Sequence, residues 1–138
     1  MKSLGSQVRI HKWNVDEARR RLADLESLAA RLAGDLEGID LEMAREQQIA
    51  GLQPDAAVTY QAYIASARKR RENLCLSIEE TRTQIDQSCD ELQEAFSNLK
   101  KFELAAKAME ARAQKLRDAK ELRVQDEVGL AIHRRQRV

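Results

Sequence analysis

The chain has 138 residues, of which 34% are charged, and its formal net charge is +1. It contains only two Phe, two Tyr and one Trp, too few bulky side chains to fill a globular core. The small net charge also gives no global field that would attract nucleic acid or an anionic membrane. Because Ala, Leu, Glu and Arg are abundant and favour helices, we expect long helices that pack along thin apolar stripes.

The N-terminal residues 1–15 show no signal peptide or membrane anchor. Arg9, His11 and Lys12 interrupt this stretch before an apolar segment could form. No later window approaches the roughly 20 apolar residues of a membrane span. The sequence therefore predicts no direct membrane insertion.

The first predicted helix covers about residues 4–50 and carries a heptad stripe. Steps of four and three residues from Val8 meet apolar side chains as far as Ala50, with only His11 and Glu46 polar. A stripe this long indicates supercoiled helices rather than one face of a compact bundle.

The only proline marks the expected reversal of the chain, at about residues 51–55. Gly51 could end the first helix in the left-handed conformation, and Pro54 suits the first turn of the next helix. Asp55 would favour the positive end of that helix dipole. So short a loop predicts an antiparallel hairpin in which residue i lies opposite about residue 107 minus i.

The second predicted helix covers about residues 56–130 and is followed by a basic tail to residue 138. Its apolar stripe runs from Tyr60 to Leu116 and is interrupted only by the polar residues Arg71, Thr81 and Ser88. The predicted fold is therefore all-α, a single coiled-coil domain formed by an antiparallel two-helix hairpin with an overhanging C-terminal helix. Residues 103–128 would extend alone by about 40 Å, and an apolar stripe without a partner in its own chain predicts an external partner.

The predicted register brings several side chains together. Arg19–Arg21 would lie within reach of Glu79, Glu80 and Asp86, and Trp13 would pack beside Phe96 at the open end of the hairpin. Acidic residues 35–40 would face the basic residues 68–71. Gly34 and Gly38 would lie on the outer face, where they either soften the helix or leave a flat patch for a partner.

Catalytic and ligand-binding patterns are missing from the sequence. His11 and His133 are the only histidines and would lie far apart, and no glycine loop could hold a phosphate. Cys75 and Cys89 are too far apart on one helix to form a disulfide, so we expect reduced thiols. The basic clusters lack the interleaved aromatic residues of a nucleic-acid site. We expect no enzyme activity, metal, cofactor or nucleic-acid partner.

Four features of the chain resemble the FliJ family of bacterial flagellar export proteins. They are the charged start SLGSQVRIHKWNVDEARRRLADLE, the reversal near residue 52, the stretch ELQEAFSNLKKFELAAKAMEARAQKLRDAKE and the ending LRVQDEVGLAIHRR. The family ending carries an acidic pair followed by small and basic residues. Asp126, Glu127, Ala131, Arg134 and Arg135 match it here.

This resemblance implies a coiled-coil stalk like the γ subunit of rotary ATPases. It implies binding to the hexameric flagellar export ATPase, stimulation of its activity, a link to the membrane export-gate protein and contacts with export chaperones. The protein would then be cytoplasmic and peripheral at the inner-membrane base of the flagellum. A self-associating scaffold and a helical secretion chaperone stay open as alternatives. Residues expected to contact the ATPase ring are Met109, Leu116, Arg117, Arg123, Asp126, Glu127, Arg134 and Arg135.

Overall fold

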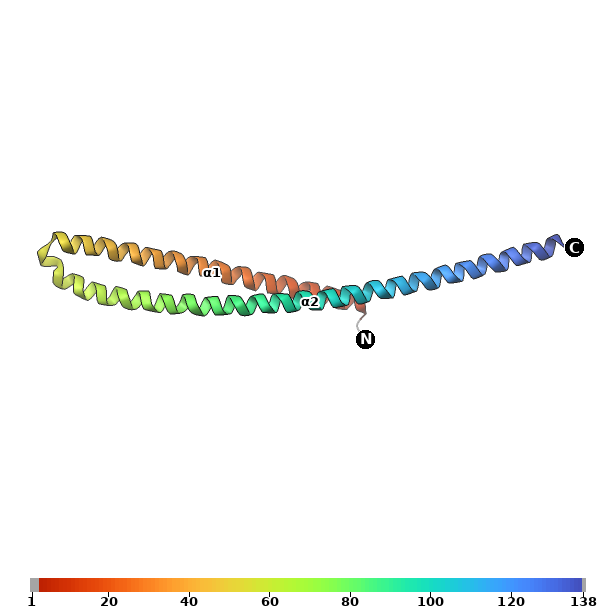
Figure 1. Cartoon of the computed structure of the whole chain (residues 1–138), viewed down its shortest axis with the longest axis horizontal. Helices are drawn as coiled ribbons and strands as arrows, with labels where there is room; N and C mark the ends of the chain where they lie inside the picture. Colours follow the sequence, from red (N-terminus) through yellow and green to blue (C-terminus); the bar gives the residue numbers. More distant parts are fainter. Residues whose placement is uncertain (1–2, 138) are drawn as a thin grey trace. The chain divides into compact units, whose positions relative to one another are not determined.

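The computed structural model describes residues 3–137 and consists of two long helices joined by a short turn (Figure 1). Helix α1 comprises Leu4–Leu52, the 3-10 turn η1 comprises Pro54–Ala56, and helix α2 comprises Ala57–Gln136. The all-α class and the helical hairpin are thus confirmed. Contacts divide the chain into two compact units, Asn14–Ala95 and Met1–Trp13 with Phe96–Val138.

Helix α1 begins at a serine cap. The Ser3 hydroxyl accepts a hydrogen bond of 3.2 Å from the backbone N–H of Ser6, which satisfies one of the free donors of the first turn. At the other end the helix runs through Gly51, and the backbone N–H of Gln53 still bonds the carbonyl of Ile49 at 3.1 Å. Helix α2 ends among His133, Arg134 and Arg135, whose positive charges complement the helix dipole.

The turn is made by the proline and its predecessor, and the prediction of a left-handed cap at Gly51 is wrong. No described glycine has a positive φ. Gln53 instead adopts an extended conformation, with φ −124° and ψ 103°, as the residue before a proline prefers. Pro54 then opens η1, which the N–H of Ala56 closes on the carbonyl of Gln53 at 3.1 Å.

Within Asn14–Ala95 the two helices lie side by side and antiparallel (Figure 1). Arg71 Nε lies 2.7 Å from Asp40 Oδ1, and their residue numbers add to 111. Arg70 and Glu42, whose numbers add to 112, approach to 3.9 Å. The predicted sum of 107 is therefore wrong by about one helical turn, because the reversal is centred on η1 rather than on residues 51–55.

The shifted register also changes the partners of the Arg19–Arg21 cluster. Arg21 approaches Glu91 to 3.9 Å, and Arg20 forms an ion pair of 2.7 Å with Glu17 on its own helix. The expected pairing with residues 79–86 is therefore wrong. These pairs are exposed, so each contributes at most about 1 kcal/mol to stability.

The interface between the two helices of this unit is thin, as the composition predicts. Its fully buried apolar side chains are small: Val15 and Ala18 on α1 and Ala67 on α2. Thr81 and Ser88 are buried with them. The larger stripe residues of this unit are half-buried, because two helices cover only one side of most stripe side chains.

The second unit holds the start of α1 against α2. The ring of His11 stacks on Phe102 with centroids 4.4 Å apart, and Leu99 is buried. The Lys100 ammonium lies 5.3 Å from the centre of the Phe96 ring, in a cation–π arrangement. Trp13 is 62% exposed and Phe96 is 43% exposed, so both rings remain largely open to solvent.

Candidate partner-binding surface

The last part of α2, residues 107–137, is here called the distal segment. Every side chain in it is exposed except that of Ala113, which is half-buried. Helix α2 has 80 residues against 49 in α1. His11 stacks on Phe102, so the start of α1 at Leu4 reaches only to about residue 109, and nearly all of the distal segment has no opposing stretch of α1 within its own unit. An isolated helix gains little stability from its backbone alone, which makes the segment a candidate for binding a partner.

Large apolar side chains of the distal segment are not confined to one stripe. Leu116, Leu122 and Val128 follow one another at intervals of six residues, which on an α-helix separates them by about 120° around the axis. Each is more than half exposed. The other exposed apolar side chains of the segment are Met109, Val124, Leu130 and Ile132. The segment therefore offers apolar contacts in all directions.

Sequence reasoning followed the heptad stripe only as far as Leu116 and missed this arrangement. A strict heptad beyond that point meets Lys120, Arg123 and Glu127, so the stripe itself ends there. The six-residue spacing of Leu116, Leu122 and Val128 is the signal that would have revealed it.

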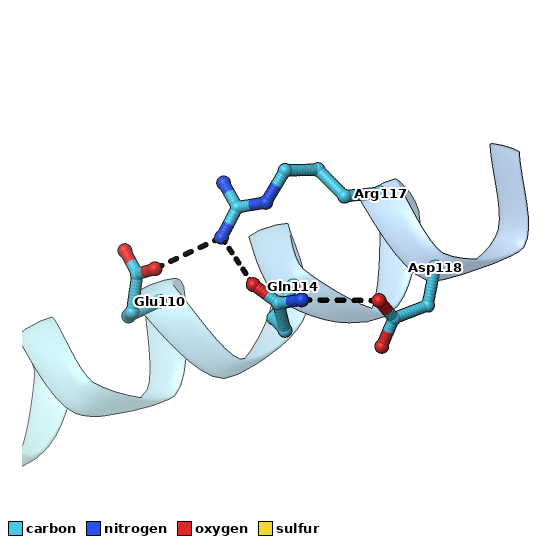
Figure 2. Close-up of polar contacts among 4 residues, drawn as sticks. All are labelled: Glu110, Gln114, Arg117 and Asp118. Atoms are coloured by element: carbon cyan, nitrogen blue, oxygen red, sulfur yellow. Dashed lines mark hydrogen bonds and ion pairs between the residues drawn. The ribbon is translucent and has the colours of Figure 1, made fainter. Parts of the chain in front are cut away.

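Polar contacts brace the first half of the distal segment (Figure 2). Arg117 Nη2 donates to Gln114 Oε1 at 2.6 Å and to Glu110 Oε1 at 3.0 Å. Gln114 Nε2 in turn donates to Asp118 Oδ1 at 3.0 Å. This ladder stiffens about two turns of helix and partly neutralises Arg117.

The structure places all eight predicted contact residues on the distal segment, and all are exposed. Within residues 3–137, Arg117 is the one of these eight whose side chain forms a hydrogen bond or an ion pair. Beyond Glu127 the described residues contain no acid, while Arg134, Arg135 and Arg137 are basic. The end of α2 is therefore a small positive surface.

A second surface feature lies on Asn14–Ala95. An open groove of about 730 Å³ runs between the two helices, with Gly34 and Gly38 on one side and Leu74 on the other. A Cβ atom added to either glycine would meet nothing within 4 Å, so the groove has room for a close contact.

Other chemistry is sparse in the part of the chain that the structure describes. No group of three or more His, Cys, Asp or Glu side chains there could hold a metal ion. Among the same residues, 3–137, no helix is both long enough and apolar enough to span a membrane. Cys75 and Cys89 are free thiols.

These observations define a helical-hairpin coiled-coil protein whose longer helix exposes an unpaired end. The chain is 30% identical over 127 residues to the "Flagellar FliJ protein" of Caulobacter vibrioides strain NA1000 / CB15N, which covers 91% of this chain and 90% of the relative. The protein of the same name from strain ATCC 19089 / CIP 103742 / CB 15 matches equally. The chain belongs to the FliJ family of flagellar proteins.

Two further comparisons found no similar protein. No family model matches the chain. No solved structure matches it either.

Proposed function

We propose that the chain is a non-enzymatic stalk component of the flagellar protein export apparatus. In this proposal it binds and stimulates the hexameric export ATPase through the distal segment and couples the ring to the membrane export-gate protein. Export chaperones are a further class of partner. The protein would act at the inner-membrane base of the flagellum.

The observation that carries this proposal is the distribution of apolar side chains on the distal segment. A single helical partner covers one face, so it would need one stripe. Leu116, Leu122 and Val128 point in three directions, which suits a partner that surrounds the helix. A ring with a central pore is such a partner.

Charge on the distal segment supports a weak contact rather than a tight one. Arg123, Arg134 and Arg135 form no ion pairs among the described residues. They are available to acidic or carbonyl-lined walls of a pore, where exposed charges give modest and salt-sensitive binding. Weak binding suits a stalk that must not hold the ATPase ring in one conformation.

The test measures ATP turnover by the export ATPase with the full-length chain and three single variants, Leu116→Ser, Leu122→Ser and Val128→Ser. If the ring surrounds the helix, the three variants should weaken stimulation to a similar degree. Loss of one exposed apolar contact should raise the half-maximal concentration roughly tenfold. Leu41→Ser, an equally exposed site on α1, is the matched control and should leave stimulation unchanged.

Two results would contradict the proposal. If none of the three variants differs from Leu41→Ser, the distal segment is not the stimulating element. If only Leu116→Ser has an effect, the partner covers one face, and a single helix is the better model.

Self-association is the second candidate function. The narrow stripe passes through Ala106 and continues past the end of α1 with Met109, Ala113 and Leu116, and its small residues allow close helix packing. Two copies paired along this stripe would bury it. Sedimentation over a range of concentrations separates the two functions, since a stable dimer that does not affect the ATPase favours a scaffold.

A further inference from the structure

The hairpin tip is almost free of charge. Residues 47–67 contain a single charged side chain, that of Asp55, in a chain that is 34% charged. The stretch includes the end of α1, η1 and the first three turns of α2 (Figure 1). So long an uncharged interval on an exposed surface needs an explanation other than solubility.

The tip also exposes large apolar side chains. Leu52 and Val58, on either side of η1, are each 82% exposed, the highest values among the exposed large apolar residues. Ile49, one turn before Leu52, is also exposed. These side chains are not buried between the two helices or against the turn, so they are available to a partner.

Side-chain types change in a definite order with distance from η1. At 1.5 Å per residue, Leu52 and Val58 lie within about 6 Å of the turn, and Tyr60 and Tyr63 lie at about 7–11 Å. Arg45, Arg68 and Lys69 follow at about 16–20 Å and are exposed. None of these three forms an ion pair within residues 3–137.

From this order we propose that the tip makes a shallow contact with an anionic lipid bilayer. Apolar side chains at the apex would enter the boundary of the acyl chains, to the 5–10 Å depth that interfacial segments reach. Tyr60 and Tyr63 are half-buried, and the Tyr63 hydroxyl is buried, so neither is a free headgroup contact. Basic residues just outside the headgroups are attracted by anionic lipid.

Charge near the base of the tip agrees with such a contact. Residues 40–46 and 68–72 contain five basic and four acidic side chains, a net charge of +1. Arg70 and Arg71 pair with Glu42 and Asp40, which leaves Arg45, Arg68 and Lys69 as the basic side chains without an ion pair within residues 3–137. With the apex about 10 Å deep, Arg45, Arg68 and Lys69 would lie about 6–10 Å outside the boundary, which is comparable to the Debye length of about 8 Å at physiological salt. Asp55 at the apex opposes insertion, so binding would be weak and reversible.

Shallow contact is compatible with the absence of a spanning helix in the described residues. It modifies the expectation from sequence that the protein makes no membrane insertion. It is also independent of the proposed function, because the test contains neither ATPase nor export gate.

A fluorescent reporter at the tip tests the contact in the full chain. Leu52→Trp places an indole at the apex, and Trp13→Phe in the same chain removes the native one. Vesicles of phosphatidylcholine mixed with phosphatidylglycerol should shift its emission to the blue, and lipids with brominated acyl chains should quench it. High salt should weaken binding. Unchanged emission at saturating lipid would overturn the proposal.

Variants without the reporter locate the binding surface by vesicle co-sedimentation. Leu52→Ser combined with Val58→Ser should lower the partition coefficient at least about tenfold, and Asp55→Asn should raise it. Leu76→Ser, an exposed leucine on α2 about 30 Å from the turn, is the matched control and should have no effect. Circular dichroism should show the same helix content for all of them.

Two outcomes of co-sedimentation count against the proposal. If Leu76→Ser lowers partitioning as much as the tip variant, the tip is not the lipid-binding surface. If the tip variant binds vesicles normally but loses a protein partner of the full chain, the tip is a protein docking surface.

Discussion

Single polar residues inside the helix interface determine much of its local energetics. The Ser88 hydroxyl is buried, with the residue 4% exposed, and has no hydrogen-bond partner among the residues that the structure describes. Thr81 is equally buried, but its hydroxyl donates to the carbonyl of Ser77 at 2.8 Å. An unpaired buried hydroxyl lowers stability, whereas a paired one is close to neutral.

Ser88→Ala should therefore stabilise the chain. The expected gain is about 1–2 kcal/mol in the free energy of unfolding, from the removed desolvation penalty and the higher helix propensity of Ala. Urea unfolding followed by circular dichroism measures it. Ser66→Ala, at an exposed position of the same helix, reports the propensity contribution alone and should gain less. A loss of stability in Ser88→Ala would mean that the hydroxyl is paired in solution.

Tyr63 gives the hairpin a pH dependence at its turn end. Burial of the phenol, reinforced by the carboxylates of Glu42 and Glu46, raises the pKa of Tyr63 above its ordinary value of 10.0. The folded state thus keeps a proton that the unfolded state has already lost. Its contribution to stability is complete below pH 10 and is lost as the pH rises through the raised pKa.

We expect Tyr63→Phe to reduce the alkaline loss of stability. Urea unfolding at about pH 9 and pH 11 should show a smaller drop for Tyr63→Phe than for the unmodified chain, since Phe has no proton to release. Tyr60→Phe, which removes the other tyrosine, serves as the comparison. Equal drops in Tyr63→Phe and the unmodified chain would show that the phenol is not held in its neutral form.

At the scale of helices, Gly34 and Gly38 are weak points of α1. Both have ordinary helical φ values, and an added Cβ meets no atom within 4 Å. Gly34→Ala and Gly38→Ala should each stabilise the chain by about 0.5–1 kcal/mol, because Ala restricts the unfolded chain and favours the helix. Thermal unfolding of the single and double variants checks this. Destabilisation would reveal a contact that needs the bare backbone.

The helices themselves were predictable from sequence, but their register was not. Stripe residues such as Leu22 and Ile78 repeat every three or four positions, which is sufficient to predict two long antiparallel helices. Register depends instead on a few residues at the turn. Gly51 looked like a helix end, whereas the extended conformation of Gln53 before Pro54 decides where the chain reverses. Helix propensity alone does not tell whether the chain reverses at Gly51 or at Gln53.

The candidate surface was predictable only in outline. Excess length of the second helix indicated that its end lacks a partner, because the first helix is too short to cover it. The residues that distinguish a surrounding partner, Leu122 and Val128, lie outside the heptad, and their six-residue spacing from Leu116 matches neither the helix period nor the heptad. The uncharged hairpin tip was not predicted either, because a stretch without charged residues is not a recognised binding motif.

Across the whole molecule, stability should be distributed unevenly between paired and unpaired helix. Residues 57–106 of α2 include the buried or half-buried stripe positions, whereas the distal segment is exposed along its length. Its local opening should require several kcal/mol less than global unfolding. We therefore expect amide hydrogen exchange in residues 107–137 to be at least about 100-fold faster than in the middle of α2.

Exchange measured by mass spectrometry also distinguishes the two ways of covering the distal segment. If a second copy pairs with it, protection of residues 107–137 should rise with protein concentration in the isolated chain. If a surrounding partner covers it, protection should be independent of concentration and rise only when the ATPase is added. Residues 14–95 should keep the same protection in every case, because their helices are already paired. Strong, concentration-independent protection of the distal segment in the isolated chain would contradict both models, since it would mean that the helix is stable without any partner.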